Sequence, residues 1–193
     1  MVTGVRGTNM LDKKPTDGFS LVSRLNHWIV GAAILALFGI GLVFHEMPRG
    51  PDRASLHALH VSIGTLAILP FLFRIFWRVR EGFPEPLPAP RWQHLASKLV
   101  YWGLLLCLLG LMISGPLAQW SGRIGELNVF GWFAIPSPFT PSRALLEAAE
   151  NAHAVIARPF LLVLVIVHVL AVVKHLVIDK DRTLMRMVTG PRT

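Results

Sequence analysis

Four of the eight histidines in this 193-residue sequence fall within or at the start of long apolar runs. They are His27, His60, His153 and His168. Ionisable side chains inside a segment long enough to cross a membrane are rare and usually functional. A neutral imidazole can bind a metal ion through one ring nitrogen. The histidines are therefore the residues of this chain whose type and position best suit chemistry.

Two of these histidines, His153 and His168, lie fifteen residues apart in one apolar run that extends from Glu150 to Ile178. A helix that rises 1.5 Å per residue would separate their imidazoles by about 22 Å along its axis. That is most of the roughly 30 Å hydrocarbon thickness of a bilayer. The spacing predicts two sites, one near each face of a membrane.

Four apolar runs are long enough to form the helices that must position the histidines. They cover about residues 25–44, 56–79, 95–117 and 150–178. The chain is 53% hydrophobic and only 16% charged, which excludes an ordinary soluble domain. The first run is longer than the apolar core of a signal peptide, so we expect it to be retained. The sequence predicts an all-α membrane four-helix bundle.

The connection from Ala118 to Leu146 is too long to be a simple turn. Its aromatic residues suit the membrane–water interface, so we expect a partly helical periplasmic cap between the third and fourth spans. Ser114-Gly115-Pro116 is expected to end the third span. Residues 1–19 are expected to be a cytoplasmic tail, and residues 20–188 one membrane domain.

The basic residues predict the orientation. Fourteen of the nineteen lysines and arginines fall on the side of both termini, and five fall on the other side. This asymmetry predicts a multi-pass membrane protein with both termini in the cytoplasm. The histidines then sort by depth into two pairs, His27 with His168 on the cytoplasmic side and His60 with His153 on the periplasmic side.

Two histidines at one depth in a helix bundle are a suitable axial ligand set for haem iron. The sequence has no Cys-x-x-Cys-His motif and a single cysteine, Cys107, so any haem would be a non-covalent haem b. The alternatives are hydrogen bonds between helices and zinc, for which cysteine or carboxylate partners are missing. His57 competes with His60, which we prefer because it lies deeper.

Arginines near the cytoplasmic pair could bind the haem propionates. The candidates are Arg24 and Arg74, and the alternative is that both are ordinary positive-inside anchors.

Five segments of the chain resemble the bacterial cytochrome b561 family of dihaem membrane proteins. The segments are 24–28 (Arg-Leu-Asn-His-Trp), 59–64 (Leu-His-Val-Ser-Ile-Gly), 73–79 (Phe-Arg-Ile-Phe-Trp-Arg-Val), 129–133 (Val-Phe-Gly-Trp-Phe) and 179–187 (Asp-Lys-Asp-Arg-Thr-Leu-Met-Arg-Met). The resemblance covers about residues 20–188. It implies two haem b groups, bis-histidine iron ligation by His27, His60, His153 and His168, and electron exchange with a quinone such as ubiquinone in the bacterial inner membrane. Trp120 and the segment 130–133 could then cover a quinone near the periplasmic haem, and the alternative is that they form only an interfacial belt.

The resemblance also implies a spacing of fourteen residues between the two ligands of the fourth span, whereas this chain has fifteen. Fifteen residues turn the two side chains about 60° apart on an ideal helix, against about 40° for fourteen. We expect a helical bulge at Pro159 to absorb the extra residue.

Three functions fit the sequence. The first is transmembrane electron transfer with quinone, which part of the family resemblance extends to superoxide:quinone oxidoreductase activity. The five periplasmic basic residues are balanced by five acidic ones, so only a local arginine patch could attract superoxide. The second is a haem-b membrane anchor that relays electrons to a separate periplasmic redox protein. The third is a haem-free scaffold. Nothing in the sequence points to nucleic acid.

Overall fold

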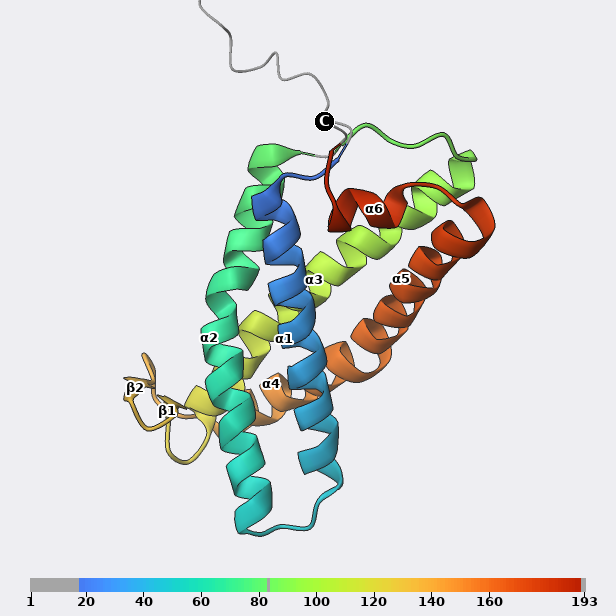
Figure 1. Ribbon diagram of the computed structural model, residues 1–193. Helices are drawn as coiled ribbons and strands as arrows, with labels where there is room; N and C mark the ends of the chain where they lie inside the picture. Colours follow the sequence, from blue (N-terminus) through green and yellow to red (C-terminus); the bar gives the residue numbers. More distant parts are fainter. Residues whose placement is uncertain (1–17, 83, 192–193) are drawn as a thin grey trace, which may run out of the picture.

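Four long helical spans form the structure, a computed structural model that describes residues 18–82 and 84–191 (Figure 1). The first three spans are α1 (Leu21–Glu46), α2 (Pro51–Glu81) and α3 (Arg91–Ser121). The fourth span comprises α4 (Arg143–Val155), the π-helix η1 (Ile156–Leu161), α5 (Leu162–Lys174) and the π-helix η2 (His175–Asp179). All four are long and apolar enough to cross a membrane, which confirms the predicted all-α membrane bundle.

The spans are longer than their apolar runs because polar residues cap them. The Ser20 hydroxyl accepts a hydrogen bond from the backbone N–H of Ser23 (3.2 Å) and so caps α1. Pro51 begins α2, where its missing N–H costs nothing. The predicted end of the third span was wrong, because α3 continues through Pro116 to Ser121. In an apolar setting a continuous helix satisfies more backbone groups than a break would.

Both described ends of the chain lie at one end of the bundle (Figure 1). A Cβ atom added to Gly18 would come within 2.7 Å of the backbone nitrogen of Pro191, so the two ends touch. We call this end of the bundle the tail end. The opposite end is called the hairpin end, after the β-hairpin described below. Of the predicted cytoplasmic tail, residues 1–19, only Gly18 and Phe19 fall within the described residues.

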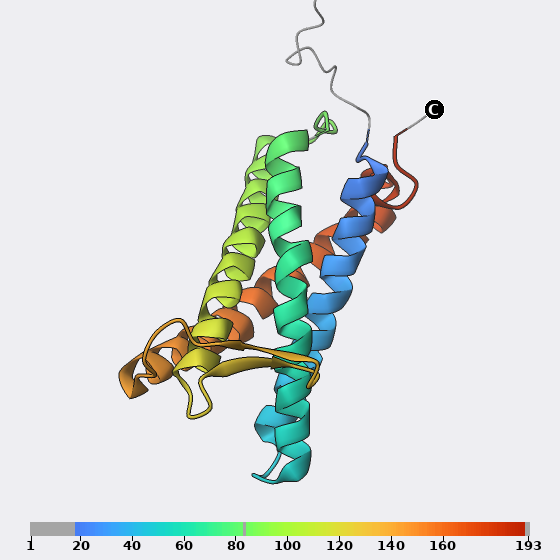
Figure 2. The ribbon, with the colours of Figure 1, turned by 90° about the vertical axis from the view of Figure 1, so that its left-hand side faces the viewer.

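The helices α1 and α2 run antiparallel and side by side (Figures 1 and 2). Asn26 is buried between α1 and α2 and donates a hydrogen bond through Nδ2 to the carbonyl of Pro70 (3.0 Å). The fourth span begins near the lower end of α3 and packs against that helix through α4, η1 and α5 (Figure 1). The helix α6 (Thr183–Val188) then brings the chain back to the upper end of α1, where Trp28 donates from Nε1 to the Met187 carbonyl (3.3 Å).

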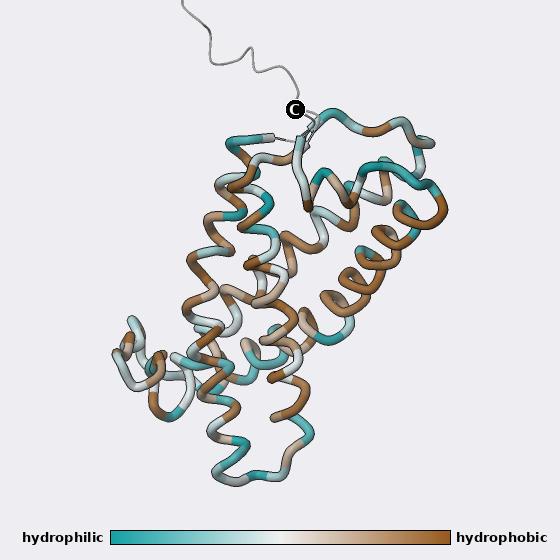
Figure 3. The backbone as a smooth tube through the Cα atoms, viewed as in Figure 1, coloured by the Kyte–Doolittle hydropathy of each residue, from teal (hydrophilic) through white to brown (hydrophobic). Residues whose placement is uncertain are grey.

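The buried core is small and the outer surface of the spans is apolar. Val30, Ala67, Phe71 and Leu108 form one buried cluster where α1, α2 and α3 meet. Leucine side chains on the outer faces of the helices are exposed, such as Leu69, which is 71% exposed. Apolar residues cover the spans, whereas polar ones gather in the connections and at both ends (Figure 3). This is the pattern of a bundle surrounded by lipid.

The connection between the third and fourth spans is built on a β-hairpin, so the expected partly helical cap was wrong. Strands β1 (Glu126–Val129) and β2 (Phe133–Pro136) pair antiparallel. The turn places Phe130 and Gly131 at positive φ (53° and 72°), which a tight hairpin favours over a helix. Ser62 of α2 holds the hairpin, since its hydroxyl accepts from the Phe130 N–H (3.0 Å) and donates to the Asn128 carbonyl (3.3 Å).

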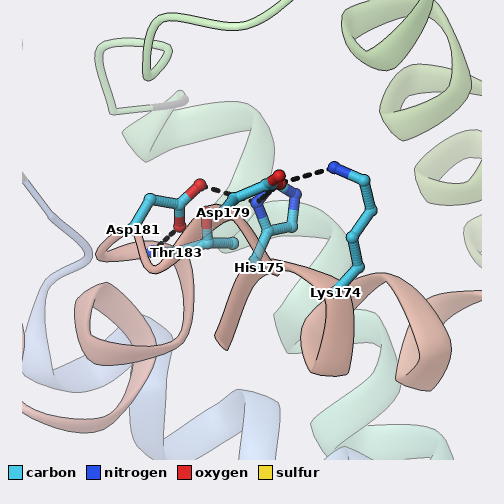
Figure 4. Close-up of polar contacts among 5 residues, drawn as sticks. All are labelled: Lys174, His175, Asp179, Asp181 and Thr183. Carbon is cyan, nitrogen blue, oxygen red and sulfur yellow. Dashed lines mark hydrogen bonds and ion pairs between the residues drawn. The ribbon is translucent and has the colours of Figure 1, made fainter. Parts of the chain in front are cut away.

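A group of polar side chains joins the fourth span to the short helix α6 (Thr183–Val188). His175 Nδ1 lies 2.7 Å from Asp181 Oδ2, the Thr183 N–H donates to Asp181 Oδ1, and Lys174 pairs with Asp179 (Figure 4). We call these five residues the tail joint. Ligand atoms of His175, Asp179 and Asp181 lie within 4.8 Å of one another. Because Lys174, His175 and Thr183 already engage the carboxylates, the tail joint acts as a connection between helices.

Candidate functional site

Two histidine pairs lie inside the bundle, and each pair joins the fourth span to an earlier helix. The ring centroids of His60 on α2 and His153 on α4 are 6.2 Å apart, with 78° between the ring planes. His27 on α1 and His168 on α5 have the same centroid separation, 6.2 Å, with 67° between the planes. The first pair lies toward the hairpin end and the second toward the tail end.

The separation within each pair suits one bound metal atom. Two imidazole nitrogens that bind a metal at about 2 Å each hold their ring centroids about 6 Å apart. Among the hydrogen bonds of the described residues, none joins His60 to His153 or His27 to His168. The rings of each pair therefore face each other across a space that a metal atom could occupy.

A hydrogen bond prepares His153, the fourth-span member of the hairpin-end pair, for ligation through Nε2. Ser114 donates its single hydroxyl proton to the Gly110 carbonyl (2.8 Å), so its oxygen accepts from His153 Nδ1 (3.0 Å). This fixes the proton on Nδ1 and leaves the lone pair on Nε2. His60 Nδ1 is buried without a hydrogen bond, and the Nδ1–Cε1 edge of the His60 ring faces Gly41 of α1.

Glycines leave room beside both rings of this pair. A Cβ atom at Gly115 would lie 3.3 Å from His153 Cε1, and one at Gly41 would lie 3.5 Å from His60 Cε1. These two glycines thus let the imidazoles pack closely against α1 and α3.

A pocket of about 970 Å³ contains this pair. Its inner wall is mainly apolar and includes Leu37, Phe38, Ile68, Leu108 and Met112. The volume is at the upper end of the roughly 300–1,000 Å³ range of ligand and cofactor pockets. A large, flat, apolar cofactor that binds between His60 and His153 would fit such a pocket.

The π-helix η1 corrects the fifteen-residue spacing. It covers Ile156–Leu161 and includes Pro159, so the expected bulge at Pro159 is confirmed. A π-helical turn closes its hydrogen bonds over five residues instead of four, and thereby absorbs one additional residue. His153 can consequently face α2 while His168, on the same span, faces α1.

Comparison with known proteins gives the family. A sequence model of prokaryotic cytochrome b561 matches residues 18–190. The cytochrome b561 homolog 2 of Escherichia coli (strain K12) is 30% identical over 181 residues, which cover 88% of this chain and 90% of that protein. The chain belongs to the prokaryotic cytochrome b561 family. Its family function is transmembrane electron transfer through b-type haem.

The residues at the two pairs fit b-type haem. Such a haem needs two axial nitrogens and a flat apolar space. The paired imidazoles and the mainly apolar pocket meet these needs at the hairpin end. At the tail end the His27–His168 pair meets the first need, and a Cβ atom at Gly31, one turn after His27, would meet nothing within 4 Å.

The predicted competitor His57 lies apart from the pair. Its ring contacts Phe44 with centroids 5.4 Å apart, and it is exposed. His57 lines the pocket, but it is His60 that faces His153. Glu150 and Arg53 are near enough to act on His57 electrostatically. The structure therefore brings together the four histidines that the depth argument selected and leaves His57 at the side.

Arg24 and Arg74, the two arginines predicted as partners of the haem propionates, have different surroundings in the structure. Arg74 is half-buried on α2 and interacts electrostatically with both His27 and His168. Arg24 instead donates from Nη1 to the Val188 carbonyl (2.6 Å), so it holds the C-terminal end of α6. Of the two, Arg74 is the arginine near the site.

Sequence reasoning missed Ser114 and Gly115 as neighbours of His153. Ser114 had been assigned to the end of a span, where its contact with His153 could not be foreseen.

The aromatic residues Trp120, Phe130, Trp132 and Phe133 had been considered as a quinone cover. None of these four lines the 970 Å³ pocket, and Trp120 donates from Nε1 to the Ile135 carbonyl of the hairpin.

Proposed function

We propose that this cytochrome transfers electrons across the bacterial inner membrane through two haem b groups. His27 and His168 would hold one haem, and His60 and His153 the other. The observation that carries the proposal is the repetition of one geometry, two facing imidazoles with centroids 6.2 Å apart, at both ends of the bundle. The positive-inside asymmetry supports a cytoplasmic tail end and a periplasmic hairpin end.

The chain supplies ligands, orientation and an apolar surrounding. When bound, haem b supplies a one-electron carrier whose iron has both axial positions filled, which favours electron transfer over oxygen binding. Ser114 keeps the His153 proton on Nδ1, and the apolar wall of the pocket excludes water. Arg74 would place a positive charge beside the tail-end pair.

The proposed electron partner in the membrane is a quinone such as ubiquinone.

For the periplasmic partner, the arginines of the hairpin end favour a small anion such as superoxide. Four of them line the pocket that contains His60 and His153, against one acidic residue, Glu150. The total charge of that side is balanced, but the charge within the pocket is positive, and such local fields attract small anions. Superoxide:quinone oxidoreductase activity is therefore the form of the proposal that we favour.

Haem counting in histidine variants tests the proposal. The wild-type protein should contain two b-type haems per chain. His27→Ala, His168→Ala and the double variant should each retain one haem, because both residues serve the same group. His27→Ala with His60→Ala should retain none. Two haems in any single variant would remove that histidine from the ligand set, and a wild-type protein without a reducible b-type spectrum would refute the function.

A further inference from the structure

The C-terminal helix α6 docks on the helix that carries His27. The Trp28 indole donates from Nε1 to the Met187 carbonyl (3.3 Å), and Arg24 donates from Nη1 to the Val188 carbonyl (2.6 Å). The first of these bonds joins the first and the last of the five segments that resemble the cytochrome b561 family. As a result α6 lies between the upper ends of α1 and the fourth span, at the tail end (Figure 1).

The end of α6 needs donors from α1, because the last four carbonyls of a helix have no partner within it. The Met185 carbonyl accepts from the backbone N–H groups of Thr189 (2.8 Å) and Gly190 (3.2 Å), whereas the carbonyls of the last two residues of α6 accept from the two α1 side chains. A Cβ atom on Gly190 would lie 3.0 Å from Arg24 Cζ, so the two segments are in close contact. A helix of six residues is too short to be stable alone, and α6 therefore depends on its docking.

Two further contacts hold α6 in place. Arg186 is only 8% exposed and donates from Nη1 to the Glu85 carbonyl (2.6 Å), in the connection between α2 and α3. The tail joint connects α6 to the fourth span. The helix is thus held from three parts of the chain, and the Met187 carbonyl is a fixed acceptor for the Trp28 indole.

Trp28 in turn contacts the His27 ring. The ring centroids are 5.4 Å apart and the planes meet at 69°, an edge-to-face arrangement. In the part of the chain that the structure describes, the His27 ring has no hydrogen bond, whereas Ser114 orients His153. A ligating imidazole is ordinarily oriented by a hydrogen bond through its second ring nitrogen. At His27 the contact with Trp28 provides the orientation instead.

We propose that Trp28, held by α6, positions the His27 imidazole for iron binding. This inference rests on the proposed haem at the His27–His168 pair. Trp28 is a positioning residue, because its ring restricts the rotation of the imidazole while the Met187 carbonyl restricts the rotation of the indole. The C-terminal segment thereby acts on the orientation of one axial ligand of the tail-end haem.

The test compares Trp28→Phe and Trp28→Leu with wild type in the full-length haem-loaded protein. Phenylalanine retains an aromatic ring but lacks the N–H that bonds to Met187, and leucine lacks both. Trp102→Leu is the matched control, because Trp102 is 56% exposed against 50% for Trp28. Trp102 also has a similar edge-to-face contact with its neighbour Tyr101 (5.2 Å, 72°), and it contacts no histidine ring among the described residues.

Electron paramagnetic resonance of the oxidised protein reports the angle between the two axial imidazole planes of each haem. A His60→Ala background isolates the signal of the tail-end haem, and a His27→Ala background isolates that of the hairpin-end haem. The rate of haem transfer to excess apomyoglobin gives haem retention.

Trp28→Phe should broaden the tail-end signal, since the ring remains but α6 no longer holds it. Trp28→Leu should shift that signal and speed the loss of the tail-end haem about tenfold, which equals about 1.4 kcal/mol. Trp102→Leu should change neither quantity. An unchanged tail-end signal in Trp28→Leu, or an equal change in Trp102→Leu, would overturn this inference and leave the proposed function intact. A wild-type protein without haem would instead refute the proposed function.

Gly190→Ala covers the case in which Trp28→Leu loses its haems through misfolding. Gly190 lies outside the membrane spans and has a φ of 91°, where an alanine is strained, so the end of α6 should separate from α1. The tail-end signal should then broaden as in Trp28→Phe, with both haems retained. A signal identical to wild type in Gly190→Ala would overturn the role of α6, and one identical in Trp28→Phe as well would overturn the whole inference.

Discussion

His153 Nδ1 and the Ser114 hydroxyl are 3.0 Å apart, and this hydrogen bond connects the fourth span to α3 beside the hairpin-end site. Because Ser114 passes its own proton to Gly110, it acts on His153 as an acceptor only. Hydrogen bonds of this kind orient a ligating imidazole and increase its basicity.

Ser114→Ala should therefore weaken haem binding at His153 by roughly 10- to 100-fold and raise the reduction potential of that haem. The tail-end haem should remain unaffected. Thr65→Val is the control, since the Thr65 hydroxyl lines the same pocket but donates only to the Val61 carbonyl of its own helix. Haem transfer and potentiometry would measure both effects, and equal behaviour of the two variants would contradict the role of Ser114.

The π-helix predicts an asymmetry between shortening and lengthening the fourth span. Deletion of Phe160, which is 58% exposed, should convert η1 into ordinary α-helix and retain both haems, because fourteen residues then separate the ligands. Insertion of one alanine after Phe160 should cost one haem, since a second bulge would be needed. Haem counts would show the difference, and two haems in the insertion variant would refute this account of the spacing.

Arg74→Gln should lower the potential of the tail-end haem on the order of 60 mV, which corresponds to a tenfold change in a one-electron equilibrium. The reason is the loss of a positive charge beside His27 and His168. Arg80→Gln provides the comparison, because Arg80 lies on the same helix, is exposed and stacks near Trp77. If both variants shift the potential equally, Arg74 acts only through general surface charge.

The tail joint should respond to acid. Partial burial tends to raise the pKa of Asp181, but hydrogen bonds from Thr183 and His175 outweigh it and hold the pKa below its usual value of 3.8. A lowered carboxyl pKa stabilises the folded form above the ordinary pKa, and this contribution is lost as the pH falls through the lowered value. Docking of α6 should therefore persist at neutral pH and weaken only below about pH 4.

Hydrogen exchange of residues 183–188 would follow this docking. Asp181→Asn should increase exchange already at pH 7, whereas Arg143→Gln, in another part of the chain, should not. Protection that is identical in wild type and Asp181→Asn would show that the tail joint does not hold α6.

The sequence was sufficient to predict those parts of the site that depend on the depth of a residue in the membrane and on its position around its helix. The spans follow from composition, and the pairing of His60 with His153 follows from the direction of successive spans. The expectation of a bulge at Pro159 needed the family resemblance as well, because only the spacing of fourteen residues that it implies made fifteen one residue too long. The other features depend on residues within single helices, where periodicity is informative.

Contacts between distant segments could not be predicted in this way. The hairpin depends on Ser62, which is 66 residues before Asn128, and on positive φ at Phe130, a residue without an obvious turn preference. Arg24 reaches a carbonyl 164 residues later in the chain, so its assignment from sequence remained open. No local pattern reveals such partners, because tertiary packing selects them.

The proposed division of ligands among the spans also has a consequence for how the protein is made. His27 and His60 belong to the first two spans to leave the ribosome, but both of their proposed partners, His153 and His168, belong to the last. Chains are synthesised from the N-terminus and enter the membrane in that order. With the proposed ligation, neither ligand set is complete until the final span has been inserted, so we expect cofactor loading to be a late step of biogenesis and a chain truncated before Arg143 to retain half of each site.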